Sequence, residues 1–287
     1  MPNTSPPAAL CASLKAIRHV ALDMDGTIYK GGTLFPFTIA ALRALKAMNI
    51  RYSFLTNNPS KSAREYLQRL HDIGIPASAD ELYTSAQATI DYLQVHRPAV
   101  KRLFILGAPG MIAEFEDAGF VSTADDAADR PDAVVVAFDT SLVYPRLCRA
   151  AWWVAEQLPY IATNPDRVCP TDKPTVLVDC GSICAAIEHA TGRKPDLVVG
   201  KPNPRMLEGI MKKYALRPGE IAMVGDRLYT DIAMAINTRA LGVLVLTGEA
   251  QREDVEKSAL KPDIVVNDLA EFCAMLEALP INHYKPV

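Results

Sequence analysis

Short apolar runs alternate with longer amphipathic segments along most of the chain. The first run covers Val20–Asp23 and a second covers Tyr52–Thr56, with apolar positions at helical spacing between them in Thr38–Met48. The back part repeats this alternation and is expected to continue the same sheet. Its predicted strands are Leu197–Val199, Ile221–Val224, Gly242–Leu246 and Ile264–Val266, and its predicted helices are Pro204–Tyr214, Leu228–Ile236 and Leu269–Leu279. Alternating strands and helices are typical of βα units, so the pattern predicts an α/β fold with a doubly wound, Rossmann-like parallel sheet.

A second set of strands and helices lies between these two parts. Its strands are expected at Leu103–Leu106, Val134–Phe138 and Tyr160–Ala162, and its helices near Gly110–Ala118, Tyr144–Gln157 and Ile183–Ala190. The stretch from Pro59 to Gly200 is far longer than the roughly 30 residues of one βαβ unit. The excess of about 100 residues is enough for a small domain. We therefore expect a core built from residues 1–80 and 191–287, with an α/β domain inserted at 81–190.

Polar clusters follow four of the apolar runs that are assigned to the core. They are Asp23 with Asp25, the segment Thr56–Asn57–Asn58, Lys201 within Gly200–Lys201–Pro202, and Asp226 with Asp231. One polar strand end is ordinary in an α/β protein. Four clusters of this chemistry are not expected by chance, and open α/β sheets bind ligands beyond the carboxyl ends of their strands.

The two acids of the first cluster stand one residue apart. A strand alternates its side chains, so Asp23 and Asp25 are expected to lean to the same side, away from Met24. One carboxylate at such a strand end can attack phosphorus while the other transfers protons. The structural alternative is that one Asp ends the strand and the other begins a turn before Gly26.

The remaining clusters supply what phosphate chemistry requires, because a phosphate dianion repels a carboxylate nucleophile. Mg²⁺ prefers oxygen ligands, and Asp23 and Asp226 can each supply a carboxylate. Lys201 can place a positive charge on the phosphoryl group. The Thr56 hydroxyl and the amides beside Asn57 can hold its oxygens. The clusters together predict a metal-dependent phosphoryl-transfer site.

Composition narrows the range of partners and locations. The chain has 287 residues, a net charge of −3 and no apolar run near the roughly 20 residues of a membrane span, so neither nucleic acid nor a membrane is expected as partner. The N-terminus lacks the pattern of a signal peptide. The six cysteines form no CxxC pair and are expected to be reduced thiols. We expect a cytoplasmic protein.

The motifs resemble those of the haloacid dehalogenase superfamily, in its phosphatase branch. They are Asp23–Met24–Asp25–Gly26–Thr27, Leu55–Thr56–Asn57–Asn58, Gly200–Lys201–Pro202 and Gly225–Asp226 with Asp231. An insert between the second and third motifs resembles the large C2-type cap of the NagD-like and 4-nitrophenylphosphatase subfamily. The segment Ala162–Thr163–Asn164–Pro165–Asp166 is similar to a cap motif of that group.

The resemblance implies a Mg²⁺-dependent phosphomonoesterase that acts through an aspartyl-phosphate. Asp23 is then the nucleophile and a metal ligand, and Asp25 is the acid and base that also binds the metal through its backbone carbonyl. Asp226 is a further metal ligand, Asp231 orients Lys201 or a metal-bound water, and Lys201 is catalytic. The predicted substrate-binding residues are Thr56, Asn57, Asn58, Asn164, Asp166, Arg167 and Cys169. Asp139, Thr140 and Tyr144 are further cap candidates for contact with the leaving group.

The substrate is expected to be a small phosphorylated metabolite such as a nucleotide, a sugar phosphate, phosphoglycolate or pyridoxal phosphate. Relatives carry Pro-Gly-x-Gly late in the cap, whereas this chain has Val178–Asp179–Cys180–Gly181–Ser182, so its substrate-facing surface is expected to differ. A phosphotransferase or mutase, or a non-catalytic sensor of a phosphometabolite, remains an alternative. A dehalogenase is disfavoured because it needs neither Asp25 nor a metal. The oligomeric state is open, with a homodimer through the cap expected by analogy.

Overall fold

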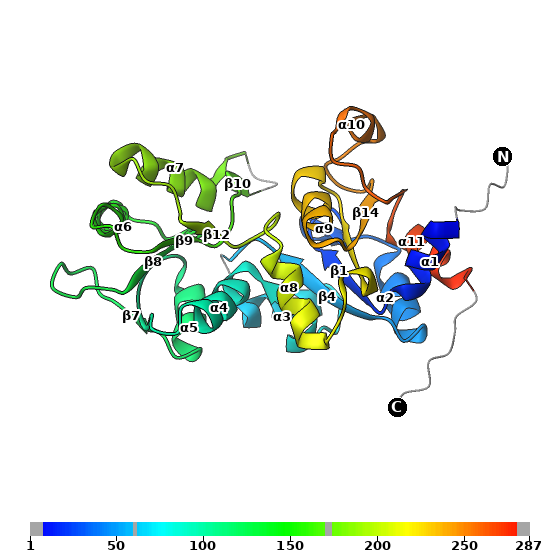
Figure 1. Ribbon diagram of the computed structural model, residues 1–287, viewed down its shortest axis with the longest axis horizontal. Coiled ribbons are helices and arrows are strands. Elements are labelled where there is room, and N and C mark those ends of the chain that lie inside the picture. The colour runs from blue at the N-terminus through cyan, green and yellow to red at the C-terminus, as the bar shows by residue number, and fades with distance from the viewer. Residues whose placement is uncertain (1–7, 60–61, 170–173, 280–287) are drawn as a thin grey trace. The chain divides into compact units, whose positions relative to one another are not determined.

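The computed structural model describes residues 8–59, 62–169 and 174–279. The chain forms two compact units, the first made of Met1–Leu55 and Ile210–Val287 and the second of Thr56–Gly209. Each unit is built around its own parallel sheet with helices on both faces, as the ribbon shows (Figure 1). The predicted α/β class with parallel sheets is therefore confirmed.

Five strands of the first unit lie in the order β15–β14–β13–β1–β4, all parallel. They are β1 (His19–Asp23), β4 (Arg51–Thr56, whose last residue opens the second unit), β13 (Ile221–Gly225), β14 (Leu241–Val245) and β15 (Ile264–Val266). A short hairpin of β2 (Tyr29–Lys30) and β3 (Thr33–Leu34) follows β1. The helices of this unit are α1 (Ala8–Ala16), α2 (Thr38–Ala47), α9 (Ala233–Thr238), α10 (Arg252–Lys257) and α11 (Leu269–Glu277).

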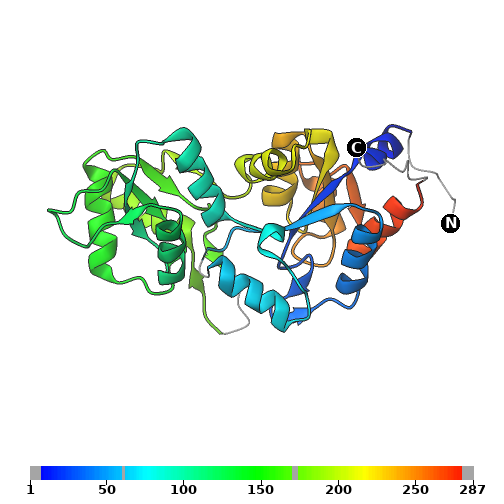
Figure 2. The same ribbon diagram turned by 90° about the horizontal axis from the view of Figure 1, so that it is seen from below.

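The helices of the first unit cover both faces of its sheet because the strand order reverses direction at β1. The chain moves from β1 to β4 in one direction and from β13 to β14 in the other, so right-handed crossovers place α2 and α9 on opposite faces. Helix α11 packs beside α2, as both views show (Figure 1, Figure 2). The strands β1, β13 and β14 are buried throughout, as expected for a sheet covered on both sides.

The second unit has five parallel strands in the order β12–β9–β8–β6–β7. They are β6 (Arg102–Leu106), β7 (Val121–Ser122), β8 (Ala133–Val136), β9 (Tyr160–Ala162) and β12 (Leu197–Val198). The helices α3 (Ala63–Asp72), α4 (Ser85–His96), α5 (Pro109–Asp117), α6 (Tyr144–Ala155) and α7 (Cys180–Thr191) belong to this unit, with the short strand β5 (Leu82–Thr84) and the hairpin β10 (Val168–Cys169) and β11 (Leu177–Val178). Helix α8 (Arg205–Tyr214) runs across the boundary between the units.

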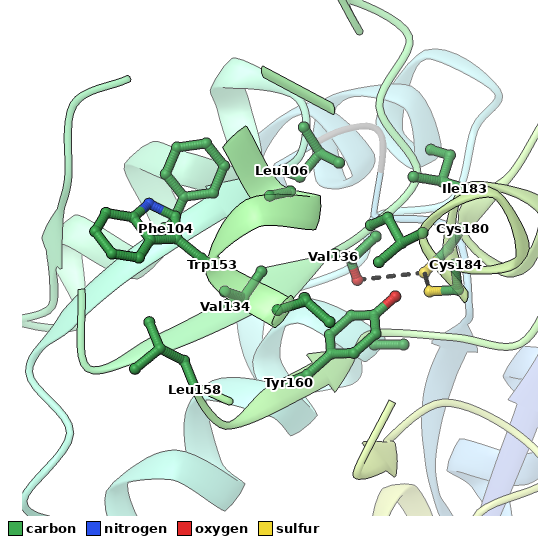
Figure 3. Close-up of a cluster of buried hydrophobic side chains, with 14 residues drawn as sticks. Phe104, Leu106, Val134, Val136, Trp153, Leu158, Tyr160, Cys180, Ile183 and Cys184 are labelled. Carbon is green, nitrogen blue, oxygen red and sulfur yellow. Dashed lines mark hydrogen bonds between the residues drawn. The ribbon is translucent and has the colours of Figure 1, made fainter. Parts of the chain in front are cut away.

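The core of the second unit lies between its sheet and the pair α6 and α7. Figure 3 shows Val134 and Val136 from β8 facing Trp153 from α6 and Ile183 from α7. The Sγ of Cys180, at the start of α7, donates a hydrogen bond to the backbone oxygen of Val136 at 3.2 Å, which anchors the helix to the sheet (Figure 3).

Two details differ from the sequence expectation. The strand at Leu197–Val199 was expected in the first sheet, but β12 pairs with β9 in the second, with Leu197 opposite Ile161. The predicted helix Leu228–Ile236 begins as a π-helical turn over Leu228–Ile232 and becomes α-helical only at Ala233. In this turn the backbone N–H of Arg227 donates to the Asp231 carboxylate at 3.1 Å, a bond that a hydrophobic pattern does not encode.

None of the helices in the described ranges is long and apolar enough to cross a bilayer.

Candidate active site

Three carboxylates gather at the carboxyl end of the first unit's sheet. One oxygen each of Asp23, Asp226 and Asp231 lies within 4.8 Å of the others. Asp23 is 9% exposed, Asp226 2% and Asp231 is fully buried. Three buried acids this close repel one another strongly when ionised, so the cluster requires a cation or protons.

Strand register explains why residues so distant in sequence meet. Strands β1 and β13 pair in parallel with Leu22 opposite Val224, so Asp23 and the segment Gly225–Asp226 leave the sheet at the same edge. On the other side of β1, Asp23 lies opposite Leu55, and Thr56 follows at the end of β4. The predicted convergence of strand ends is therefore present for the acids of this unit.

Two glycines make room for the Asp226 carboxylate. A Cβ on Gly26 would lie 2.4 Å from its Oδ2, and Gly26 also has a positive φ of 85° that favours glycine. A Cβ on Gly248, in the loop after β14, would also overlap Asp226 Oδ2. The Thr247 hydroxyl of the same loop donates to the backbone oxygen of Gly26 at 2.5 Å, which joins the two glycine segments.

The Asp226 carboxylate has one satisfied oxygen and one that is not. Its Oδ2 accepts from the Glu249 backbone N–H at 2.7 Å, whereas its Oδ1 is buried and has no hydrogen-bond partner. Burial and the nearby charges of Asp23 and Asp231 raise the pKa of Asp226 to about 8. A buried carboxylate oxygen without a donor, among other carboxylates, is a donor set that fits a hard divalent cation such as Mg²⁺.

Arg227 is a basic group at this edge of the unit, and its charge acts on Asp23 and Asp226 as well as on Glu249. Arg227 Nε lies 2.9 Å from a Glu249 carboxylate oxygen. The Tyr229 hydroxyl donates to that same oxygen at 3.1 Å. Asp231 accepts from the Arg227 backbone and packs against Gly225, where a Cβ would lie 2.3 Å from the Asp231 carboxyl carbon. Gly225 and Arg227, the two neighbours of Asp226 in the chain, therefore hold the Asp231 carboxylate in place.

Asp25 lies in a tight turn beside this cluster, and its side chain is not one of the three grouped carboxylates. The Gly26 N–H donates to the Tyr29 oxygen at 2.7 Å, and the N–H groups of Thr27 and Ile28 both donate to the Met24 oxygen. Asp25 is partly exposed, unlike Asp23. This separation is compatible with different tasks for the two acids.

The other predicted phosphate-binding residues belong to the second unit. Thr56 and Lys201 are 8% and 4% exposed. The Thr56 hydroxyl accepts from the Asn58 backbone N–H at 3.1 Å. Asn57 makes two hydrogen bonds to the backbone of Lys201, at 2.8 and 3.0 Å. The structure thus joins the second and third motifs within one unit, although they are far apart in sequence.

The predicted cap residues fall into two groups. Asn164 is fully buried, and its amide donates to the Asn57 backbone oxygen at 2.7 Å. Asp166 and Cys169 are partly exposed, and Arg167 is exposed. Cys169 lies on β10 and its Sγ accepts from the Asn58 side-chain amide at 3.2 Å, so Asn58 is the link between the second motif and the β10–β11 hairpin.

Asp139, Thr140 and Tyr144 occupy a turn and the start of α6. Asp139 is buried and accepts from both the backbone N–H and the hydroxyl of Ser141, at 2.8 and 2.6 Å. Thr140 is exposed, and Tyr144 is 78% exposed. The Asp139 carboxylate is therefore occupied by its own turn, and contact of these three residues with a leaving group stays a prediction.

Sequence reasoning missed the segment Thr247–Gly248–Glu249. It contacts the Asp226 carboxylate through the Glu249 N–H and the close approach of Gly248. The signal was present, since this polar segment directly follows the apolar strand β14, just as the other site clusters follow their strands.

Two family models match this chain. One describes haloacid dehalogenase-like hydrolases and matches residues 20–121, and a HAD-hydrolase-like model matches residues 198–272. The ribonucleotide monophosphatase NagD of Escherichia coli K12 is 31% identical over 255 residues, which are 89% of this chain and 98% of that protein.

Solved structures show the same likeness. The 4-nitrophenylphosphatase of Thermotoga maritima matches with a TM-score of 0.85 and 41% identity, over 91% of this chain and 98% of that one. The glycerol phosphate phosphatase of Mycobacterium tuberculosis in complex with magnesium matches with a TM-score of 0.84 and 28% identity, over 93% of this chain and 79% of that one. The resemblance inferred from the motifs is confirmed. The chain belongs to the haloacid dehalogenase-like hydrolases, and within them to the phosphatase branch that contains NagD and the 4-nitrophenylphosphatases.

Proposed function

We propose that this chain is a Mg²⁺-dependent phosphomonoesterase that hydrolyses a small phosphorylated metabolite through an aspartyl-phosphate at Asp23. The observation that carries the proposal is the buried group of Asp23, Asp226 and Asp231, in which Asp226 Oδ1 has no hydrogen-bond donor. The names of relatives support it: they are phosphatases of ribonucleotides, nitrophenyl phosphate and glycerol phosphate, and one was solved with magnesium.

Asp23 and Asp226 would hold the metal with their carboxylates, and Asp25 with its backbone carbonyl. When bound, Mg²⁺ supplies positive charge that offsets the repulsion between a phosphate dianion and these carboxylates. In the first step the Asp23 carboxylate attacks phosphorus, the bond to the leaving oxygen breaks, and Asp25 gives that oxygen its proton.

In the second step Asp25, now ionised, takes a proton from water, whose oxygen attacks the phosphorus of the aspartyl-phosphate. Inorganic phosphate leaves and the Asp23 carboxylate is restored. Lys201 and the Thr56 hydroxyl would stabilise charge on the phosphoryl oxygens in both steps. Asp231 would keep the carboxylate cluster ordered through its contact with Gly225 and the Arg227 backbone.

The insert at 81–190 is proposed to select the leaving group, because the phosphoryl part is common to all candidate substrates and gives no discrimination. Arg167 and Cys169 are its candidate contacts. A homodimer and a cytoplasmic location stay predictions.

Turnover of 4-nitrophenyl phosphate with Mg²⁺, followed by kcat/KM for nucleoside monophosphates, pyridoxal phosphate, phosphoglycolate and sugar phosphates, tests the proposal. A phosphatase releases inorganic phosphate from at least one of these. A transferase would instead pass the group to an added acceptor alcohol, and a sensor would bind without turnover.

A further inference from the structure

Asn57 and Lys201 are joined by a pair of reciprocal hydrogen bonds. The Lys201 backbone N–H donates to Asn57 Oδ1 at 2.8 Å, and Asn57 Nδ2 donates to the Lys201 backbone oxygen at 3.0 Å. Both residues are more than nine-tenths buried. One carboxamide thus binds both polar groups of a single backbone unit, which fixes the position and the orientation of the main chain that carries the Lys201 ammonium.

The backbone of Asn57 is itself held by two donors. Its carbonyl oxygen accepts from Asn164 Nδ2 at 2.7 Å and from the Ser85 hydroxyl at 2.8 Å, and both of these residues are fully buried. The Asn164 Oδ1 accepts from the Asp166 backbone N–H at 3.0 Å. Each side-chain amide therefore has its oxygen and its nitrogen engaged within the second unit, which favours a supporting task over direct contact with substrate.

Close packing keeps these segments together. A Cβ on Gly200 would lie 2.7 Å from both Asn57 Oδ1 and the Thr163 backbone oxygen, so only glycine fits before Lys201 without displacing Asn57. The Gly200 N–H also donates to the Thr163 oxygen at 2.8 Å. The loop that carries Lys201 therefore packs against Thr163, at the end of β9.

The network continues to the start of α7, inside the stretch that departs from the Pro-Gly-x-Gly of relatives. The buried carboxyl of Asp179 accepts from the Cys180 N–H and caps α7, and burial, with the nearby Asp166, raises its pKa to about 7. A Cβ on Gly181 would lie 2.3 Å from the Pro165 backbone oxygen. Cys180 anchors the same turn to β8 (Figure 3). This stretch therefore packs against Pro165 and Asp166, the residues that directly follow Asn164.

We propose that Asn57, held by Asn164, is a positioning residue that places Lys201 for phosphate binding, and that neither asparagine contacts the substrate. This rests on the proposed function, in which Lys201 binds the phosphoryl group. The two asparagines, predicted from the sequence as substrate ligands, act through Lys201 because their amides hold its backbone. Phosphate affinity and turnover then depend on Asn57 only while the Lys201 ammonium is present.

A double-mutant cycle tests this dependence. Asn57→Ala, Lys201→Ala and the double variant are compared for the Kd of inorganic phosphate with Mg²⁺ and for kcat on 4-nitrophenyl phosphate. Lys201→Ala removes the ammonium and leaves the backbone bonds of Asn57 in place. We expect Asn57→Ala to weaken phosphate binding at least tenfold alone, but less than threefold in the Lys201→Ala background. Asn164→Ala is expected to behave in the same way with a smaller loss.

Thr123→Val is the matched control. Thr123 is 5% exposed and its hydroxyl donates to the Leu103 backbone oxygen in the same unit, so this variant loses a buried bond of the same class away from Lys201. It should destabilise the fold without weakening phosphate binding. If Asn57→Ala does not fold, Asn164→Ala, which removes a donor to the Asn57 backbone and keeps both bonds of Asn57 to Lys201, enters the cycle instead.

Losses that multiply in the double variant would show that Asn57 contacts phosphate itself and would overturn the inference. A wild type that binds phosphate with a coupled cycle but has no turnover would refute the proposed function and leave the positioning intact. A wild type that neither binds nor turns over phosphate would overturn both.

Discussion

Asp23 and Asp226 present carboxylate oxygens within 4.8 Å of each other at the ends of two paired strands. Both carboxylates are buried, and an oxygen of Asp231 lies within the same distance of each.

Asp226→Asn should raise the thermal stability of the metal-free protein while abolishing turnover. The fold raises the pKa of Asp226 to about 8, so its protonated form is favoured in the folded state. The associated stability is full below the unfolded pKa near 4 and is lost as pH rises through 8. The gap in Tm between variant and wild type in EDTA should therefore widen from pH 5 to pH 8.5.

The pKa of Asp179 is also raised, but Asp179 is present in both proteins, so its contribution cancels in the difference between the two Tm values at each pH. Added Mg²⁺ should close the gap, because it binds the wild type and not the variant. If the Tm of the variant in EDTA were lower than that of the wild type at every pH, the Asp226 carboxylate would stabilise the metal-free fold, and the prediction would be wrong.

Asp25→Asn should slow turnover by about 10²–10⁴ and leave Mg²⁺ and phosphate affinity close to wild type. The reason is that its side chain stands outside the carboxylate cluster, so its loss removes proton transfer alone. Steady-state kinetics and calorimetric titration measure the two effects. Metal affinity that falls in step with the rate would assign the Asp25 side chain to the metal instead.

Chelation should silence the enzyme, and Mg²⁺ should restore it. Ca²⁺ should bind in its place and inhibit, because its larger and looser coordination shell is a poor match for in-line transfer. Phosphate release from 4-nitrophenyl phosphate after dialysis against EDTA, then with each cation, gives the readout. Full activity in chelator would refute the metal assignment.

Arg167→Ala and Cys169→Ser should reorder kcat/KM among large substrates with little effect on acetyl phosphate. Both side chains are at least partly exposed on or beside the β10–β11 hairpin, unlike the buried Asn164. Asn164→Ala is the contrast, since loss of its support for Asn57 should lower activity on all substrates alike. Equal losses on acetyl phosphate in all three variants would place specificity elsewhere.

The sequence predicted the parallel α/β class, most strand positions and the strand-end acids, because apolar runs followed by Asp are local signals. The prediction for Leu197–Val199 was wrong, because this strand lies in the other sheet. Both parallel sheets have apolar strands, so the apolar pattern of a two-residue strand does not indicate which sheet it joins. The sequence also did not predict the hydrogen bond of Glu249 to Asp226 or those of Asn57 to Lys201. They depend on loops that meet only after the sheets form.

We expect Asp23 to be phosphorylated during turnover. The most direct measurement mixes the Asp25→Asn variant with 4-nitrophenyl phosphate and Mg²⁺, quenches in acid, reduces with borohydride and sequences the peptides by mass spectrometry. Homoserine is expected at position 23 alone, absent without Mg²⁺ and absent in an Asp23→Asn variant whose turnover is at least 10² slower. Homoserine at another aspartate, or Mg²⁺-dependent turnover by Asp23→Asn within tenfold of wild type, would show that Asp23 is not the nucleophile.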